Sequence, residues 1–255
     1  MELNKIYYTD CLEGIKQLDN NSVSLVITSP PYAMQRKFQY GGINEKDYPE
    51  WTLKWMEELR PKLKDDASVC INIRPHIKNG EISDYVLRTR LALRENGWKE
   101  CEELIWIKTT SPPMGSTERP RRAWESILWF SKTNKPKCYP KACGTESNRI
   151  GFSGSKFEEG GTSHIHAGQK PPIQKGVARC VDYIAVGTGN VEKGYNHPAM
   201  FPPEIPEYII KMMTDEGDLV VDPFIGSGTT GRVAEKLNRN WVGFEINEEY
   251  RGNAV

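Results

Sequence analysis

The stretch "VVDPFIGSGTT", residues 220–230, joins an apolar strand pattern to a helical pattern through a glycine-rich turn. Glycine lets a backbone turn tightly and approach a ligand closely, and the first turn of a helix offers unpaired N–H groups. We expect a threonine to cap the helix that follows. The stretch therefore predicts a strand, a ligand-binding turn and a helix.

The chemistry of the ligand follows from what accompanies this turn. The lysine of a phosphate-binding loop does not follow the glycines, and the third glycine of a dinucleotide-binding fingerprint is missing. Glu245 instead stands at the end of the next predicted strand, "NWVGFEI", where a carboxylate can bind both hydroxyls of a ribose. The pattern favours a nucleoside ligand without a phosphate. The alternative is a glycine-rich turn without a ligand.

Strand and helix patterns alternate outward from this stretch. Strands are predicted at 4–10, 23–28, 67–74, 101–108, 124–132, 218–224 and 240–246, and helices at 47–63, 82–96, 202–215 and 229–238. Such alternation predicts an α/β fold with a mostly parallel twisted sheet. Between residues 133 and 196 the periodicity fades and Gly, Ser, Lys, Pro and His accumulate. Because this stretch is too long for an ordinary loop, we expect a small irregular insertion that divides the chain into segments 1–132, 133–196 and 197–255.

Composition sets further limits on the class of protein. The chain has 255 residues, with 34 basic and 34 acidic side chains, so any basic surface must be local. The polar start predicts no signal segment, and no apolar run approaches the ~20 residues of a membrane span. Six scattered cysteines favour a reducing, cytoplasmic location. We expect no metal, because the spacing of the cysteines and histidines at 138–180 fits no common zinc framework.

A second motif, "VSLVITSPPYAM" at 23–34, ends an apolar strand in a diproline followed by tyrosine. An exocyclic base amine is a poor nucleophile because its lone pair is delocalised into the ring. Ser29 Oγ and the Pro30 carbonyl can accept its two hydrogens and localise that lone pair, while the prolines keep the acceptors rigid. Tyr32 supplies a ring on which a flipped base can stack. The alternative is a diproline turn beside a core tyrosine.

Together, "TSPPY" and "DPFIGSGTT" resemble the catalytic and cofactor motifs of the S-adenosylmethionine-dependent DNA amino-methyltransferases. With the catalytic motif first, the order resembles the permuted beta class of that family, which implies a Rossmann-like methyltransferase fold. Serine at position 29 implies methylation of cytosine N4, with adenine N6 as the alternative. An inactive DNA-binding relative is a third hypothesis, although both motifs are intact.

The resemblance also implies site residues. The catalytic ones are Ser29, Pro30, Pro31 and Tyr32. "YYTDCLEGI" resembles the strand that brings an aspartate to the adenine, and "HPAMFPPEIPEYII" the segment at the methionine end of the cofactor. The predicted cofactor residues are Asp10, Cys11, Thr28, His197, Phe201, Pro202, Asp222, Pro223, Phe224, Gly226, Ser227, Gly228, Thr229 and Glu245.

Contacts with double-stranded DNA must come from local charge. Residues 108–141 hold eight basic and two acidic side chains, which predicts a phosphate-binding patch. The predicted DNA contacts are Arg36, Lys37, Arg119, Arg121 and Arg122, and the insertion is expected to read the target sequence. The alternative for the basic stretch is a solvated loop. We also expect a monomer or homodimer, and a cognate restriction endonuclease as a possible partner.

Overall fold

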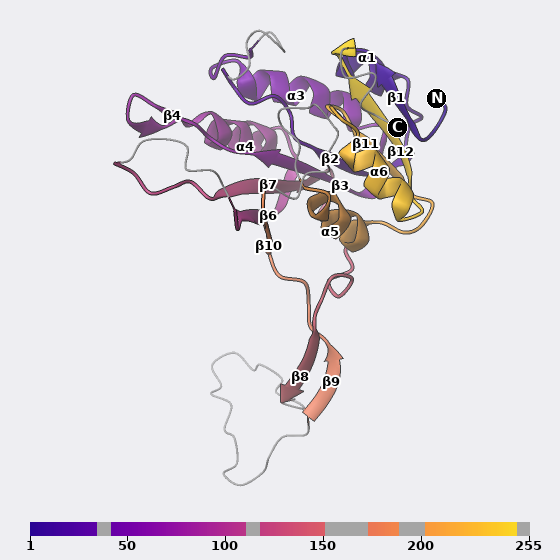
Figure 1. Cartoon of the computed structure of the whole chain (residues 1–255). Coiled ribbons are helices and arrows are strands. Elements are labelled where there is room, and N and C mark those ends of the chain that lie inside the picture. Colours follow the sequence, from indigo (N-terminus) through magenta and orange to yellow (C-terminus); the bar gives the residue numbers. More distant parts are fainter. Residues whose placement is uncertain (35–41, 111–117, 151–172, 189–201, 249–255) are drawn as a thin grey trace. The chain divides into compact units, whose positions relative to one another are not determined.

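The computed structural model describes residues 1–34, 42–110, 118–150, 173–188 and 202–248 (Figure 1). The chain divides into two compact units, of which the first combines Met1–Tyr139 with Asp182–Val255 and the second is Pro140–Val181. The second unit is shorter than the insertion predicted at 133–196. One reason is that the strand at 183–186 pairs within the main sheet of the first unit.

An eight-stranded sheet forms the centre of the first unit. Neighbouring strands are parallel except at β7, which runs antiparallel to both β3 and β6. Across the sheet the order is β1 (Lys5–Tyr8), β12 (Asn240–Glu245), β11 (Leu219–Asp222), β2 (Val23–Thr28), β3 (Leu63–Ile73), β7 (Trp124–Ser131), β6 (Lys99–Lys108) and β10 (Tyr183–Val186). The mostly parallel sheet is the one that the sequence predicts.

Helices cover both faces of this sheet (Figure 1). α1 (Cys11–Lys16), α3 (Tyr48–Leu59) and α4 (Tyr85–Glu95) pack side by side, whereas α5 (Glu204–Met213) packs against α6 (Thr229–Lys236). The right-handed crossover explains this division. The connections β1–α1–β2 and β2–α3–β3 move across the sheet in one direction, while β10–α5–β11 and β11–α6–β12 move in the other. Their helices therefore lie on opposite faces.

The core lies between the two helical layers. All six residues of β2 are buried, as expected for a central parallel strand with helices on both faces. α3 contributes Trp55, Met56 and Leu59, each at most 1% exposed, from the apolar stripe that predicts this helix. The predicted helix at 47–63 ends earlier, at Leu59, because Leu63 already begins β3.

Two small hairpins were not predicted from the sequence. β4 (Ile77–Lys78) pairs with β5 (Glu81–Ile82) in the first unit. Its two turn residues, Asn79 and Gly80, have φ of 51° and 80°, which the two-residue turn of a tight hairpin requires. In the second unit, β8 (Glu146–Ile150) pairs antiparallel with β9 (Ile173–Val177). The strands are too short to show a clear alternation of apolar and polar residues.

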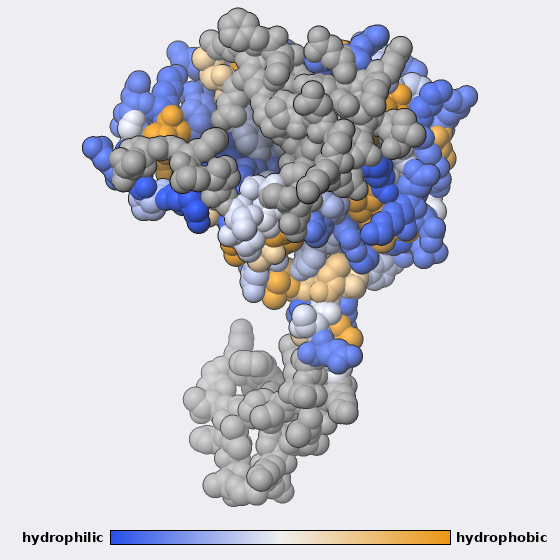
Figure 2. Space-filling view, viewed as in Figure 1, coloured by the Kyte–Doolittle hydropathy of each residue, from blue (hydrophilic) through white to orange (hydrophobic). Residues whose placement is uncertain are grey.

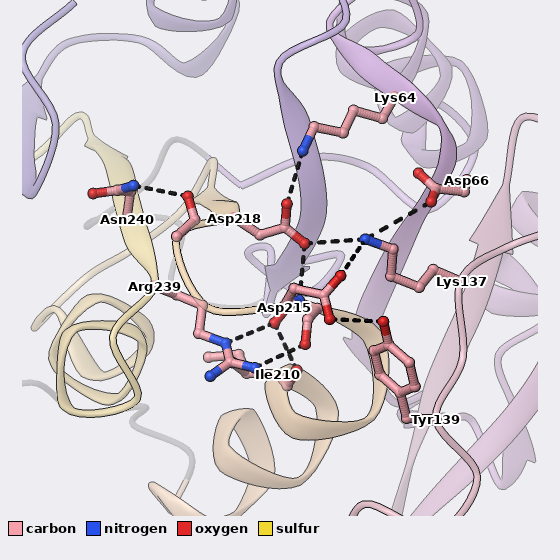
Figure 3. A network of polar contacts seen from close by, with 11 residues as sticks. Lys64, Asp66, Lys137, Tyr139, Ile210, Asp215, Asp218, Arg239 and Asn240 are labelled. Atoms are coloured by element: carbon pink, nitrogen blue, oxygen red, sulfur yellow. Dashed lines mark hydrogen bonds and ion pairs between the residues drawn. The ribbon is translucent and has the colours of Figure 1, made fainter.

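An anchor cluster of charged side chains lies at the amino-terminal edge of the sheet (Figure 3). Asp218, just before β11, accepts hydrogen bonds from Lys64 Nζ at 2.7 Å and from the Asp215 backbone N at 2.9 Å. Lys137 Nζ contacts Asp215 at 2.9 Å and Asp218 at 3.3 Å, and the Tyr139 hydroxyl donates to Asp215 at 2.6 Å. These contacts fasten residues 137–139 to the turn between α5 and β11.

The described residues visible in Figure 2 are mainly hydrophilic, with hydrophobic residues in small groups. This pattern agrees with an apolar interior closed off by the two helical layers. Among the described residues, no helix is both long enough and apolar enough to cross a bilayer.

Candidate active site

The two sequence motifs meet where the sheet changes direction. β2 and β11 are adjacent parallel strands, yet the chain leaves β2 toward β3 and leaves β11 toward β12. The loops after these strands therefore diverge, and such a switch point in an open α/β sheet is where ligands bind. Ser29 follows β2 and Pro223 follows β11, so both motifs begin at this crevice.

The turn between β11 and α6 depends on its glycines. Gly226 and Gly228 have φ of 52° and 86°, in the left-handed region that glycine adopts without strain. Gly228 is itself the residue that caps α6, and no side chain caps this helix. The expectation of a threonine cap is therefore wrong, because Thr229 already lies inside the first turn. Gly228 itself has no side chain, so the cap position adds no bulk at the helix N-terminus.

Asp222 holds this turn to the strand beside it. Its Oδ1 accepts from the Thr28 hydroxyl at 2.8 Å and from the Phe224 N–H at 3.1 Å, and its Oδ2 accepts from the Thr230 hydroxyl at 2.7 Å. Asp222 is only 2% exposed. Burial raises the pKa of its carboxyl to about 6, although the hydrogen bonds from Thr230 and Thr28 oppose that shift. Asp222 and Thr28 thus position the two loops rather than face solvent.

Glu245 closes the same turn from β12. Its Oε2 accepts from the Gly226 N–H at 3.0 Å, and its Oε1 accepts from the Asn247 N–H at 2.8 Å. The side chain is buried, and burial raises the pKa of its carboxyl despite these backbone hydrogen bonds. A carboxylate has about four acceptor positions, so Glu245 can still accept a hydrogen bond from a ligand hydroxyl.

The other predicted cofactor residues within the described ranges gather along the same edge of the sheet. β1 pairs with β12 so that Tyr8 lies opposite Glu245, and Asp10 follows, where its side chain caps α1 by accepting from the Leu12 N–H at 2.9 Å. Cys11 is buried, which raises the pKa of its thiol to about 12. The other predicted residues that are buried here are Pro202, Pro223, Ser227 and Thr229.

Phe224 belongs to an aromatic cluster at this turn. Its ring lies 5.4 Å from that of Trp51 and 5.7 Å, edge to face, from that of Trp55, measured between centroids. Both tryptophans come from α3. The contacts fix one side of Phe224, and the residue as a whole stays only partly buried. A planar ligand group can therefore pack on its free side.

The Ser-Pro-Pro-Tyr segment ends in a polar network around the buried residues Asn72 and Glu125. We call it the catalytic-edge cluster, and its partly buried members are Ser29, Tyr32 and Lys108. The Tyr32 hydroxyl donates to Glu125 Oε2 at 2.6 Å. Asn72 Nδ2 lies 2.9 Å from Glu125 Oε2, 3.1 Å from the Tyr32 hydroxyl and 3.4 Å from Ser29 Oγ. Lys108 Nζ forms an ion pair with Glu125 Oε1. Burial, and next the charge of Glu125, raise the pKa of Tyr32.

Sequence reasoning identified only part of this cluster. Asn72 was missed, because an asparagine near the end of β3 looks like any polar strand residue. Lys108 was counted as a DNA-binding charge, whereas it is the partner of Glu125. A signal was present, since Lys108 follows the apolar run Leu104–Ile107 of β6 and Glu125 stands at the start of the mostly apolar β7, near the ends that meet in their antiparallel pairing.

Some lysines of the predicted basic patch have acidic partners in the fold. Lys108 pairs with Glu125, Lys132 with Asp65 at 2.9 Å, and Lys137 with Asp215 at 2.9 Å. Three of the eight basic side chains in residues 108–141 therefore have acidic partners, Lys108 within this stretch and Lys132 and Lys137 elsewhere in the chain.

The arginines after residue 118 lie differently. Arg119 is exposed and donates to the Gly80 carbonyl at the tip of the β4–β5 hairpin, at 2.5 Å. Arg121 is also exposed, and Arg122 is partly buried, with a pKa lowered by burial and by the neighbouring Arg74. The other predicted site residues, Arg36, Lys37, His197 and Phe201, lie outside the described residues.

Comparison with known proteins decides the family. A family model described as DNA methylase, of the N6/N4 type, matches residues 23–255. The chain is a member of this DNA methyltransferase family. The type II methyltransferase M.PvuII of Proteus hauseri is 33% identical to this chain over 272 residues, which cover 96% of this chain and 80% of the relative. M.BglII of Bacillus subtilis is 30% identical over 254 residues, covering 97% and 67%.

Solved structures agree with the fold. The PvuII DNA methyltransferase, whose title calls it cytosine-N4-specific, superposes with a TM-score of 0.74 at 29% identity, covering 96% of this chain and 83% of that one. The complex of M1.HpyAVI with SAM has a TM-score of 0.61 at 21% identity, covering 98% and 96%, and shows likeness of fold. The predicted family and fold class of the methyltransferase are confirmed.

Proposed function

We propose that this methyltransferase transfers the methyl group of S-adenosylmethionine to the exocyclic N4 of cytosine in double-stranded DNA, after the base has left the helix. The observation that carries the proposal is the meeting of Ser29-Pro30-Pro31-Tyr32 with the Asp222–Thr229 turn at the switch point between β2 and β11. The PvuII enzyme, which bears the cytosine-N4 description, is the relative that supports the choice of base.

The reaction depends on the shape of the target nitrogen. Ser29 Oγ and the Pro30 carbonyl accept one amine hydrogen each, which localises the lone pair on nitrogen and directs it at the methyl group. Pro30 is buried and the two prolines fix the backbone, so the acceptors need little reorganisation during the reaction. The hydroxyl of Tyr32 is held by Glu125, and its partly exposed ring supplies the stacking face for the flipped base.

S-adenosylmethionine occupies the carboxyl ends of the neighbouring strands β11, β12 and β1. The Glu245 carboxylate accepts from the ribose hydroxyls, and the glycines at 226 and 228 allow the ligand to approach the backbone. The exposed side of Phe224 packs on the adenine, and Asp10 lies beside the adenine amino group. No phosphate is needed, which agrees with the missing lysine in the turn.

DNA is bound by arginines near the mouth of the site. Arg119 and Arg121 are exposed, and the β4–β5 hairpin that Arg119 contacts follows directly from β3, next to Asn72. These side chains supply phosphate contacts, which make the affinity depend on salt. We assign sequence reading to the region predicted at 133–196. A cognate restriction endonuclease fits the type II description of the relatives, and free cysteines fit a reducing cytoplasm.

The experiment is incubation with labelled S-adenosylmethionine and mixed-sequence DNA, followed by chromatography and mass spectrometry of the nucleosides. We expect N4-methylcytosine. Ser29→Ala should lower the single-turnover rate about 10²–10³-fold, because one preorganised contact to the reacting group is lost. Cofactor affinity by calorimetry should stay unchanged, since Ser29 acts on the base.

Each other outcome has its own meaning. N6-methyladenine as the sole product would make the enzyme an adenine methyltransferase working through the same acceptors. DNA binding without any methylated nucleoside would identify an inactive relative. An unchanged rate in Ser29→Ala would refute the role of the serine.

A further inference from the structure

The catalytic-edge cluster contains more chemistry than binding of the target base requires. Glu125 is 7% exposed and forms an ion pair with Lys108, whose side chain is 12% exposed. Burying a charge pair is costly, and removing the charges often leaves a fold as stable or more stable. A pair kept behind the Ser-Pro-Pro-Tyr segment therefore calls for a chemical reason.

Hydroxyl groups connect Glu125 to the segment that faces the amine. Asn72 Nδ2 lies 3.4 Å from Ser29 Oγ and 3.1 Å from the Tyr32 hydroxyl, so the two hydroxyls meet at one amide nitrogen. The Tyr32 hydroxyl in turn donates to Glu125 Oε2 at 2.6 Å. Asn72 Nδ2 approaches all three groups and keeps their oxygens together. Ser29, Tyr32 and Glu125 thus form a series of neighbouring groups around Asn72, two of them hydroxyls with exchangeable protons and the last a carboxylate.

Methyl transfer creates a proton that needs such a path. As the amine nitrogen bonds to the methyl carbon, the carbon–sulfur bond breaks and its electron pair stays on sulfur, which becomes a neutral thioether. The nitrogen now carries the positive charge and must lose one hydrogen to give the methylated base. Loss of this proton restores the delocalisation of the nitrogen lone pair into the aromatic ring. The charged form is therefore strongly acidic, and a carboxylate suffices to accept its proton.

We propose that Glu125 is the final acceptor of the proton released by the target amine, and that the hydroxyls of Ser29 and Tyr32 carry it there. The inference rests on the proposed function. Ser29 Oγ takes the proton from nitrogen and gives its own to the Tyr32 oxygen, and Tyr32 gives its proton to Glu125 Oε2. Each hydroxyl ends with one proton, and the neutral carboxyl returns its proton to solvent after the base leaves.

The surroundings of Glu125 fit this role. Lys108 from β6, Tyr32 and Asn72 contact it directly. The charge of Glu125 also acts on Tyr85 from α4 and on Arg122. The other buried acids of the described residues, Asp222 and Glu245, accept hydrogen bonds from the turn after β11 and its neighbours. Glu125 is the buried carboxylate that is bonded to Tyr32.

The test compares Glu125→Gln, the double variant Glu125→Gln/Lys108→Met, and Tyr32→Phe, in single-turnover methylation over a range of pH. Gln keeps the hydrogen bonds from Tyr32 and Asn72 but takes no proton, and Met removes the lysine charge left without a partner. We expect each variant to be slowed at least about tenfold, with cofactor affinity unchanged. The fall in rate at the acid end of the wild-type profile should be absent from both Gln variants.

A wild-type rate in Glu125→Gln, or its recovery in the double variant, would overturn the proposal and leave Glu125 as a counter-ion for Lys108. Combining Tyr32→Phe with Glu125→Gln should cost no more than either change alone, because both interrupt one path. If Glu125→Gln does not fold, Tyr32→Phe decides alone, and an undiminished rate refutes the path. The wild type is assayed in parallel with every variant. If the wild type does not methylate DNA, the proposed function fails, whatever the variants do.

Discussion

Two polar clusters lie at opposite ends of the strands of the same sheet. They differ in how completely their hydrogen-bonding groups have partners. The anchor cluster, seen in Figure 3, joins Lys64, Lys137, Tyr139, Asp215 and Asp218 through contacts in which each carboxylate has several donors. In the catalytic-edge cluster, Asn72 Oδ1 is buried and has no hydrogen-bond partner among the residues that the structure describes.

The difference separates groups that stabilise the fold from groups prepared for a ligand. A satisfied network gains nothing further from a ligand, whereas a buried acceptor without a partner is costly unless a ligand supplies the missing hydrogen. Burial differs as well, since Lys64 is 35% exposed and Lys108 is 12% exposed. The polar groups at the amino-terminal ends of the strands serve stability, whereas those at the carboxyl ends include an unsatisfied acceptor available to a ligand.

The largest expected effect concerns two aspartates, one at each end of β11, whose pKa values are shifted in opposite directions. Burial raises the pKa of Asp222 from 3.8 to about 6, so the folded state keeps a proton that the unfolded chain has lost. Stability should therefore fall as pH rises from about 4 to 6, by up to about 3 kcal/mol. Asp218 has a lowered pKa, although burial opposes it, because Lys64 hydrogen-bonds its carboxylate. Its contribution is present above the usual pKa of 3.8 and is lost as pH falls.

Urea denaturation of Asp222→Asn and Asp218→Asn across this pH range checks the contrast. Relative to the wild type, Asp222→Asn should gain stability as pH rises from about 4 to 6, because the Asn amide cannot ionise. Asp218→Asn should gain relative to the wild type as pH falls below about 4. If both variants gained stability relative to the wild type in the same direction of pH change, the contrast between the two aspartates would be wrong.

A smaller effect is expected when the anchor cluster loses its central acid. Asp218→Ala removes the acceptor for Lys64 and the Asp215 N–H, and should cost about 1–3 kcal/mol of unfolding free energy, measured by urea titration. Asp65→Ala is the matched control, since Asp65 is 90% exposed in its pair with Lys132 and should cost less than about 1 kcal/mol. Single-turnover methylation should be unchanged in both. A lost rate with retained stability would show that the anchor cluster also serves catalysis.

The smallest effect concerns basic residues near each edge. Arg121→Ala should weaken DNA binding only a few-fold and reduce the slope of log affinity against log salt by about 0.9, because one phosphate contact is lost. Lys137→Ala should leave that slope unchanged, since Lys137 is bound by Asp215 and Asp218. Binding titrations at several salt concentrations give both slopes. A change of slope in Lys137→Ala would contradict the division of roles between the two edges.

Much of the site could be predicted because its constraints are local. The glycines at 226 and 228 mark a turn that needs positive φ, and the diproline after β2 marks a rigid segment. The end of β12 then predicts the place of Glu245, because parallel strands end at one edge of a sheet. The threonine cap failed for a local reason too, since the second glycine takes the cap position itself.

The sequence by itself determined the α/β fold, the two motifs and their meeting at one edge of the sheet, because strand periodicity, glycine and proline act within a few residues. Only the tertiary structure decided which charges are neutralised and which polar groups share a site. Lys137 finds Asp215 and Asp218 at separations of 78 and 81 residues, and Thr28 finds Asp222 at 194. Asn72, Lys108 and Glu125 likewise become one cluster only when β3, β7 and β6 pair. Electrostatic partners are set by distance in space, which local sequence patterns do not encode.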